Sequence, residues 1–187
     1  MASPIAIDLC CGLGGWTAGL LAEGYRVIGF DIARPKRFPT GALFVQQDIA
    51  TIDGTRWRGR VALVVASPPC TEFSQAWNYA KHRQPDPLGG MELVHHAFRI
   101  GRECGADFLL ENVAGARVHF LQQYGPPSWH VGPFYFWGGA PVLRPHGRFV
   151  KGITRDKAER ARIPLELARA AAAQHRVGAW WRGAAYE

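Results

Sequence analysis

The N-terminal part of the chain follows the order strand, glycine-rich turn, helix, strand, and this order restricts the fold more than any other feature. Ile5–Leu9 is a short apolar run that predicts a strand, and residues 10–15 form a turn with three glycines. Residues 16–23 predict a helix that ends at Gly24, because glycine favours the left-handed conformation of a helix C-cap. Arg26–Asp31 predicts a second strand. Such a unit within about thirty residues is one half of a nucleotide-binding βαβ arrangement, so we expect an α/β fold with a mostly parallel sheet.

Asp31 stands at the end of the second predicted strand, where it can accept hydrogen bonds from both ribose hydroxyls of an adenosine-bearing ligand. Its separation from the glycine turn, about twenty residues, fits this role. The dinucleotide pattern G-x-G-x-x-G is not met, since the glycines are Gly12, Gly14, Gly15 and Gly19. This spacing suits S-adenosylmethionine (SAM) better than NAD, and SAM needs no P-loop lysine because it carries no phosphate. A tight turn without a ligand is the alternative interpretation.

A third strand is predicted at Leu43–Gln46 and is followed by Asp48 and Ile49. In an adenosine site, Asp48 can bind the exocyclic amine of adenine and Ile49 can cover the face of the ring. Alternatively, Asp48 is the N-cap of a short turn, since aspartate is favoured at that position. Both interpretations stay open on these residues alone.

An apolar run at residues 61–66 predicts a fully buried parallel strand. Pro68 and Pro69 end this strand, because proline has no N–H to donate to the sheet. Cys70 follows at the carboxyl end, where ligand crevices lie in open α/β sheets. The sequence therefore places a thiol where chemistry is expected, with a small buried hydrophobic residue as the alternative.

Residues 107–113 predict another buried strand, which ends in Glu111 and Asn112. If this strand neighbours the strand at 61–66, Glu111 lies near Cys70. Burial beside apolar residues raises the pKa of a carboxyl, and such a group can act as an acid toward a ring nitrogen. A structural carboxylate that caps the following turn is the alternative.

The segment between these two strands begins with a long loop, predicted at 74–90, and continues as a helix predicted at 91–104. Loops of this length are uncommon in compact domains and are typical of lids and binding loops. Aromatic and basic residues are interleaved in the loop, which is typical of nucleic-acid binding. We expect Ser74 and Trp77 to contact the substrate from it.

The formal net charge of the chain is +7, and most of it lies in the last quarter. Residues 144–187 contain ten lysines and arginines against four acidic residues. Such an excess favours a polyanionic partner, so we expect this part to face phosphates. A solvated helical face is the alternative.

Length and composition predict a soluble protein with one domain. A chain of 187 residues is long enough for one domain that buries about 70% of its unfolded surface. No apolar run approaches the ~20 residues that span a bilayer, and the first residues lack a signal-peptide pattern. The four cysteines have no metal-ligand spacing. We therefore expect free thiols, no metal site, no membrane partner and a cytoplasmic location.

Together these motifs resemble the DNA (cytosine-5)-methyltransferase family over residues 4–137. The segments that carry the resemblance occur in the family's order: 8–16, Asp31, 48–49, 68–74 and 111–113. The resemblance implies the family's fold, a Rossmann-like SAM-dependent methyltransferase domain with a mostly parallel sheet and helices on both faces.

The resemblance also implies a mechanism and a cofactor site. Cys70 adds to C6 of cytosine, which allows C5 to accept the methyl group of SAM. Glu111 protonates or hydrogen-bonds N3, and Asn112 positions the loop. In duplex DNA the target base is first flipped out of the stack, and the loop at 74–90 closes over it. The residues expected to form the cofactor pocket are Asp8, Leu9, Cys10, Cys11, Gly12, Leu13, Gly14, Gly15, Asp31, Ile32, Asp48, Ile49, Ser67 and Pro69.

The chain departs from the family pattern in two places. The family's arginine-rich strand corresponds to residues 129–137, which offer His130 and no arginine. His130 can donate a hydrogen bond to the base or be structural, and Arg144 or Arg148 can supply the missing charge. The family's target-recognition domain corresponds to residues 138–152, which are too few for a domain.

We therefore expect a catalytic domain over residues 1–187, with a vestigial recognition segment at 138–152 and a basic helical part at 153–187. Its closing helix is predicted at 164–174, and the Gly-Asn pair that precedes this helix in the family is absent. The expected function is SAM-dependent methylation of cytosine C5 in DNA, with little or short sequence recognition or a partner subunit that supplies it. The alternatives are a weakly active homologue that binds SAM and nucleic acid, a methyltransferase acting on RNA or single strands, and an exocyclic-amine methyltransferase. The oligomeric state stays open.

Overall fold

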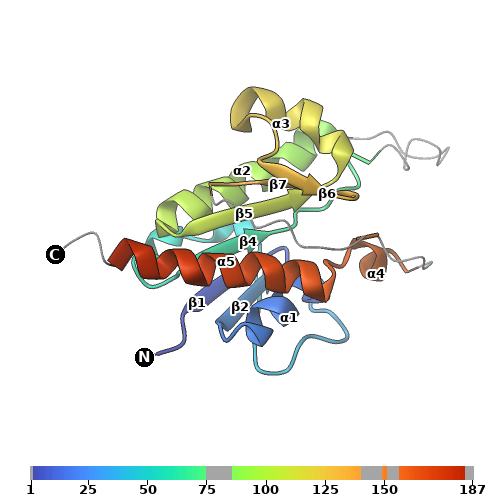
Figure 1. Ribbon diagram of the computed structural model, residues 1–187. Coiled ribbons are helices and arrows are strands. Elements are labelled where there is room, and N and C mark those ends of the chain that lie inside the picture. Colours follow the sequence, from blue (N-terminus) through green and yellow to red (C-terminus); the bar gives the residue numbers. More distant parts are fainter. Residues whose placement is uncertain (1, 75–85, 140–148, 151–155, 184–187) are drawn as a thin grey trace.

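The structure is a computed structural model (Figure 1), and it describes residues 2–74, 86–139, 149–150 and 156–183. Trp77, Arg144 and Arg148, three of the predicted substrate contacts, lie outside these ranges. Most of the predicted loop at 74–90 and of the segment at 138–152 also lies outside them.

A single mixed sheet forms the centre of the protein. In the described part of the chain its strands are β1 (Ile5–Leu9), β2 (Arg26–Asp31), β3 (Leu43–Gln46), β4 (Leu63–Ala66), β5 (Asp107–Asn112), β6 (Trp129–Val131) and β7 (Phe134–Trp137). Their order in the sheet is β3-β2-β1-β4-β5-β7-β6. The first five run parallel, and β7 is antiparallel to both β5 and β6.

Side chains on the central strands alternate between two hydrophobic cores, as the period of a strand requires. On β4, Val64 and Ala66 point into one core, whereas Leu63 and Val65 point into the other. All four are fully buried. This explains why the run at 61–66 is apolar throughout rather than alternating.

Helices cover both faces of the sheet. The described helices are α1 (Gly15–Ala22), α2 (Pro87–Cys104), α3 (Arg117–Tyr124), α4 (Lys157–Ala161) and α5 (Leu165–Gly183), with short 3-10 turns η1 (Ile49–Thr51), η2 (Gly54–Trp57) and η4 (Ala114–Ala116). In Figure 1, α5 runs next to α1 across one face, and α2 lies on the other. The predicted α/β class, a mostly parallel Rossmann-like sheet with helices on both faces, is confirmed.

The contact between α1 and α5 depends on small residues. A Cβ atom on Gly19 would lie 2.3 Å from the Cβ atom of Ala168, far inside van der Waals contact. Leu167, Ala168 and Ala171 are buried at this contact, at the spacing of one helical face. The C-terminal helix is therefore packed tightly onto the N-terminal βαβ unit.

Several predicted boundaries are wrong. α2 begins at Pro87, so the last four residues of the predicted loop form its first turn; Asp86 caps this turn by accepting a hydrogen bond from the Gly89 N–H at 3.0 Å. Residues 129–137 form a hairpin rather than one strand, with Gly132 at φ 53° between β6 and β7.

At the C-terminus, α5 continues nine residues beyond the predicted end at 174, because its Ala-rich sequence contains no proline. β4 begins at Leu63, two residues after the start predicted for the strand at 61–66.

Candidate active site

The carboxyl ends of the parallel strands bring the predicted motifs to one edge of the sheet. β1 leads into the glycine turn and β2 ends at Asp31. β4, which lies next to β1, leads into the segment 67–70. β5, which lies next to β4, ends with Glu111 and Asn112. Because these ends are adjacent, residues more than 40 positions apart in sequence become neighbours.

The glycine turn is joined directly to the end of β2. Asp31 accepts a hydrogen bond from the Gly12 N–H at 2.9 Å and another from the Ala33 N–H at 3.1 Å. Cys10 has φ 54°, the one positive φ of a non-glycine residue among the described residues. Such strained backbone conformations cluster at functional sites, where surrounding contacts hold them.

The carboxyl of Asp8 points away from this turn and into the protein. It is fully buried, and its Oδ2 accepts hydrogen bonds from the Thr17 N–H at 3.0 Å and the Thr17 hydroxyl at 2.6 Å. Burial raises the pKa of Asp8 to about 7, although both bonds from Thr17 act to lower it and the charge of Asp31 raises it further. Asp8 therefore anchors the first turn of α1, and its side chain is not a contact of the cavity at the turn.

A cavity of about 110 Å³ lies against the glycine turn. Six of the predicted cofactor residues line it: Cys10, Cys11, Gly12, Leu13, Gly15 and Ser67. Its other wall comes from the C-terminal part of the chain, through Ala158, Ala161, Arg162 and Ile163. A Cβ atom on Gly15 would lie 2.6 Å from the backbone N of Ile163, so a glycine is required for this wall to approach the turn.

The nucleoside end of a SAM-like ligand would lie outside this enclosed space, since ligand pockets usually measure about 300 Å³ or more. Asp31, at the end of β2, and the adjacent Ile32 offer a carboxylate and an apolar side chain there. Ile32 is 70% exposed, so its side chain is accessible to a ligand. The cavity, the Asp31 carboxylate and the Ile32 side chain thus have the chemical properties that suit, respectively, a small polar end, a ribose and a planar ring of one ligand.

The remaining predicted cofactor residues take structural positions. Leu9 and Ile49 are buried in the core, so any contact with a cofactor would come from their backbone. Asp48 is the N-cap of η1 and accepts a hydrogen bond from the Ala50 N–H at 2.9 Å. Gly14 is the N-cap of α1 with φ 74°, and Pro69 is exposed.

The segment that carries Cys70 is fixed to the end of β5 by two hydrogen bonds. The Asn112 side-chain amide donates to the Pro68 carbonyl at 3.2 Å. The Ser67 hydroxyl donates to Glu111 Oε2 at 3.2 Å. Glu111 is 5% exposed and Asn112 fully buried, whereas Cys70 is partly exposed. The carboxyl and amide therefore belong to the buried end of the sheet, and Cys70 lies in the partly exposed loop that follows β4.

The turn after Cys70 is anchored to two other elements, at Asp86 before α2 and at Phe120 of α3. The Glu72 carboxylate accepts a hydrogen bond from the Asp86 N–H at 2.8 Å. Phe73 is buried and packs edge-on against Phe120 of α3, with ring centroids 5.3 Å apart. Ser74, a predicted substrate contact, is half-buried at the end of this anchored turn.

His130 lies on the outermost strand of the sheet, where it is exposed and stacks on Tyr135 with centroids 4.8 Å apart. The same ring also has a neighbouring arginine that the sequence analysis did not single out: the guanidinium of Arg117 lies 5.1 Å from the Tyr135 centroid. Tyr135 pairs with Asn112 between β7 and β5. The stacked arrangement favours a structural role for His130.

The thiols of Cys10 and Cys11 in the glycine turn are poor candidates for a nucleophile. Burial raises the pKa of both, and the nearby carboxylates of Asp8 and Asp31 raise it further. Cys104 is fully buried on α2, and burial raises its pKa to about 11. Cys70, at the strand end, is the thiol whose position suits chemistry.

The sequence profile described as "C-5 cytosine-specific DNA methylase" matches residues 5–123. The chain belongs to this family. The matched range contains every strand end described above, including Cys70, Glu111 and Asn112.

One relative of this chain is the type II methylase M.HgiDII of Herpetosiphon aurantiacus. The two are 28% identical over an alignment of 144 positions, which covers 67% of this chain and 39% of that protein. A solved structure of a candidate DNA modification methyltransferase encoded within an E. coli prophage has TM-score 0.47 and 24% identity, covering 61% of this chain and 33% of its own. A mutant of Spodoptera frugiperda DNMT2 has TM-score 0.41 and 16% identity, covering 73% and 49%. The chain spans under half the length of each of these proteins.

Two parts of the site were not predicted from the sequence of this family member. The Trp16 indole donates a hydrogen bond to Ser67 at 2.9 Å, although the resemblance used Trp16 only as the end of the glycine motif. The cavity wall at residues 158–163 was also missed, because the Gly-Asn pair that would have marked it is absent. Within the described ranges, no helix is long and apolar enough to cross a membrane, and no group of three potential metal ligands occurs.

Proposed function

We propose that this chain transfers a methyl group from SAM to C5 of cytosine in DNA through a covalent bond between Cys70 and C6. The observation that carries the proposal is the pair of hydrogen bonds joining the segment 67–70 to Glu111 and Asn112, which support a thiol and a buried carboxyl on adjacent strand ends. A nucleophile and an acid fixed in this way are the two groups that addition to a pyrimidine ring requires.

The chemistry of the chain's own residues starts at Cys70. Its thiolate forms a bond to C6, and the electron pair of the C5–C6 double bond becomes available at C5. Glu111 donates a proton or hydrogen bond to N3, which lowers the cost of adding electron density to the ring. SAM, when bound, supplies the methyl group to C5. A base then removes the C5 proton, the C6–S bond breaks, and the Cys70 thiolate leaves.

Asn112 acts on position rather than on the reacting atoms. Its amide holds the Pro68 carbonyl, and its Oδ1 accepts a hydrogen bond from the Val113 N–H at 2.9 Å. The first bond fixes the loop between β4 and Cys70 relative to β5, and the second holds the Asn112 side chain in the orientation that makes it. Misplacing a nucleophile by about 1 Å can reduce a rate about 100-fold, so this anchoring is part of the catalytic arrangement.

Residues that would hold SAM lie at the glycine turn and at the end of β2. Asp31 has its carboxylate oriented by Gly12 and Ala33, so its remaining acceptor sites can bind ribose hydroxyls. The exposed Ile32 can cover a face of the adenine. The methionine end would take the cavity between the turn and Arg162.

We further propose that DNA is the nucleic-acid partner and that the chain forms one catalytic domain. The net charge of +7 supports binding to phosphates, which would be weakened strongly by salt. With residues 138–152 in place of a recognition domain, sequence recognition would be short or would come from another subunit.

Methyl transfer to duplex DNA tests the proposal. The full chain, SAM labelled in its methyl group and a cytosine-rich duplex should yield 5-methylcytosine on mass spectrometry of the digested DNA. Cys70→Ser should abolish the product, whereas Cys104→Ser, which alters a buried thiol on α2, should keep it. A product methylated at the exocyclic amine would contradict the assignment of the target atom.

A further inference from the structure

The carboxyl of Glu111 is held by a chain of two hydrogen bonds that begins on α1. The Trp16 Nε1–H donates to the Ser67 hydroxyl at 2.9 Å, and this hydroxyl donates to Glu111 Oε2 at 3.2 Å. An indole N–H can only donate, and a serine hydroxyl has a single hydrogen. Ser67 therefore accepts from Trp16, and its hydrogen points to Glu111.

The position of the indole is itself fixed. Trp16 is 2% exposed and meets Phe136 edge-on, with centroids 6.2 Å apart. Phe136 pairs with Glu111 in the register of β7 and β5. The next residue on α1, Thr17, is bonded to the buried Asp8. The donor to Ser67 thus rests on the same two strands that carry the glycine turn and Glu111.

We propose, building on the methyl transfer proposed above, that Trp16 and Ser67 are positioning residues that fix Glu111 Oε2 as a hydrogen-bond acceptor and leave Oε1 as the atom that carries the proton to N3 of the base. A carboxyl that accepts at one oxygen carries its proton on the other. The Ser67–Glu111 bond thereby selects one of the two protonated forms before the base arrives, which is a form of preorganisation.

The test compares Ser67→Ala with Ser67→Thr in the full chain. Ser67→Ala should lower kcat at least tenfold when SAM is saturating, and Ser67→Thr should restore most of kcat because it keeps the hydroxyl. The alkaline limb of the pH–rate profile should move to higher pH in Ser67→Ala, since the ionised carboxyl loses a donor. Trp16→Phe should change the profile in the same direction.

A readout without turnover separates this inference from the proposed function. The infrared band of the Glu111 carboxyl, identified by its loss in Glu111→Gln, should shift in Ser67→Ala and remain in place in Ser67→Thr. An unshifted band in Ser67→Ala, or parental kcat and pH profile, would overturn the inference. If the parental protein transfers no methyl group, but the Glu111 band still shifts between the parental protein and Ser67→Ala, the proposed function is overturned and the inference about Ser67 stands.

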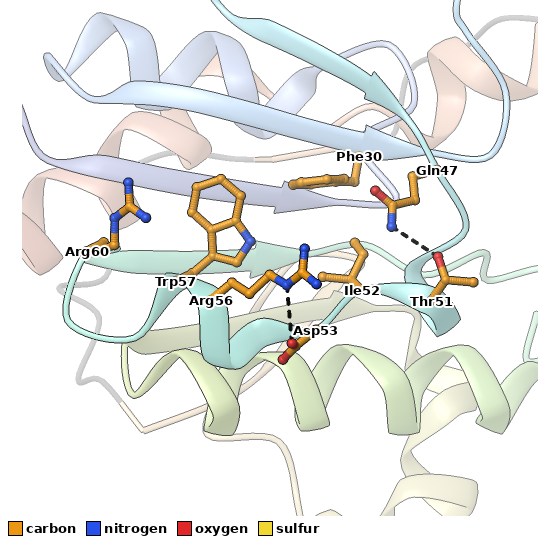
Figure 2. Close-up of a pocket in the computed structure, with 8 residues that line it drawn as sticks. All are labelled: Phe30, Gln47, Thr51, Ile52, Asp53, Arg56, Trp57 and Arg60. Atoms are coloured by element: carbon orange, nitrogen blue, oxygen red, sulfur yellow. Dashed lines mark hydrogen bonds and ion pairs between the residues drawn. The ribbon is translucent and has the colours of Figure 1, made fainter.

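A separate hollow of about 410 Å³ lies on the α2 face of the sheet, within the usual size range of ligand pockets. Its apolar floor is formed by Phe30, Ile52 and Trp57, all part of the core on that face. Figure 2 shows the side chains of these residues and of two arginines around one space between β2 and η2. None of them lines the cavity at the glycine turn.

The rim of this hollow is positively charged. Arg56 pairs with Asp53 at 3.4 Å, so these two charges offset each other. Arg60 makes no hydrogen bond or ion pair from its guanidinium within the described ranges, and it is exposed beside Trp57 (Figure 2). A free guanidinium next to an indole suits a planar ring that carries an anion. We infer that this hollow binds a nucleotide, either free or within a DNA strand.

Calorimetry with AMP in saturating SAM tests this second inference. AMP should bind, and Arg60→Ala should weaken it at least tenfold. Arg58→Ala is the matched control, because the Arg58 Nε–H donates to the Glu103 carbonyl at 3.0 Å instead of facing the hollow; it should stay within twofold. A single-stranded oligonucleotide that competes with AMP identifies DNA as the source, and failure to compete identifies a free nucleotide. Absent AMP binding, or equal losses in both variants, would overturn it.

Discussion

The effect of Asp8→Asn on stability should depend on pH: the unfolding free energy of the variant, measured against that of the parent, should be more favourable at alkaline pH than at acid pH. Asp8 is fully buried, and its pKa is raised from the ordinary value of 3.8 to about 7 in the folded chain. The unfolded chain therefore releases this proton at lower pH than the folded chain does. Stability from the neutral carboxyl is complete below the unfolded pKa and is lost as pH rises toward the folded pKa.

The size of the effect follows from these two values. Between pH 5 and pH 8 the parent should lose ~2–3 kcal/mol of unfolding free energy through Asp8, at about 1.4 kcal/mol per pKa unit. Asparagine does not ionise and can still accept one bond from Thr17, so Asp8→Asn lacks this loss. Its unfolding free energy relative to the parent should therefore improve by ~2–3 kcal/mol over that range.

Urea unfolding of both proteins at pH 5 and pH 8 measures this difference. Asp53→Asn is the control. Asp53 is exposed, and a hydrogen bond from the Thr55 hydroxyl lowers its pKa; the Thr55 backbone N–H and the charge of Arg56 lower that pKa further. Its carboxylate is ionised at both pH values, so the effect of Asp53→Asn should be the same at each. An Asp8→Asn effect that is equally independent of pH would refute the assignment of a neutral Asp8 below pH 7.

Other predictions concern single contacts of the site. Asp31→Ala should weaken SAM binding at least tenfold in calorimetry, about 1.4 kcal/mol, and unchanged affinity would remove Asp31 from the ribose site. Asn112→Ala should cost ~1–3 kcal/mol in urea unfolding, because the buried Pro68 carbonyl loses its donor; a neutral result would contradict the anchoring. Gly15→Ala should destabilise the fold, since its Cβ would meet the Ile163 backbone at 2.6 Å, and full stability would show that α4 and α5 can move aside. DNA affinity should fall steeply between 50 and 200 mM salt, and a flat response would contradict a phosphate-facing surface.

The sheet and the position of the site were predictable because they depend on local patterns. Apolar runs at 5–9, 26–31 and 107–113 are buried on both faces, so their composition identifies them as parallel strands. Parallel strands gather their carboxyl ends at one edge. That the glycine turn, Cys70 and Glu111 lie at one edge therefore followed from the order of elements, whereas the adjacency of β4 and β5 came from the structure.

Other elements lacked such a pattern. α3 contains one buried residue, Phe120, and its remaining side chains are polar or exposed, so no apolar period indicates a helix. The first turn of α2 contains Gly89 and Gly90, which are typical of loops. Gly90 is needed there because a Cβ atom would lie 2.9 Å from Glu72, a tertiary contact that sequence does not reveal.

The hydrogen bonds that organise the site also lay beyond prediction. Trp16 and Ser67 are 51 positions apart, and Ser67 and Glu111 are 44 apart. Each of these residue types has common structural roles, and only the register of β4 beside β1 and β5 brings them together. Asp8 was likewise predicted as a cofactor contact, although its partner is Thr17 on the adjacent helix.

Trapping on 5-fluorocytosine tests the central claim most directly. Fluorine at C5 cannot leave as a proton does, so an enzyme that adds Cys70 to C6 and methylates C5 stays bonded to the base. With SAM present, mass spectrometry should find the chain linked to the oligonucleotide through the peptide containing Cys70, and Cys70→Ser should give no adduct. SAM binding that remains intact without an adduct on duplex DNA, single-stranded DNA or RNA would contradict the covalent mechanism.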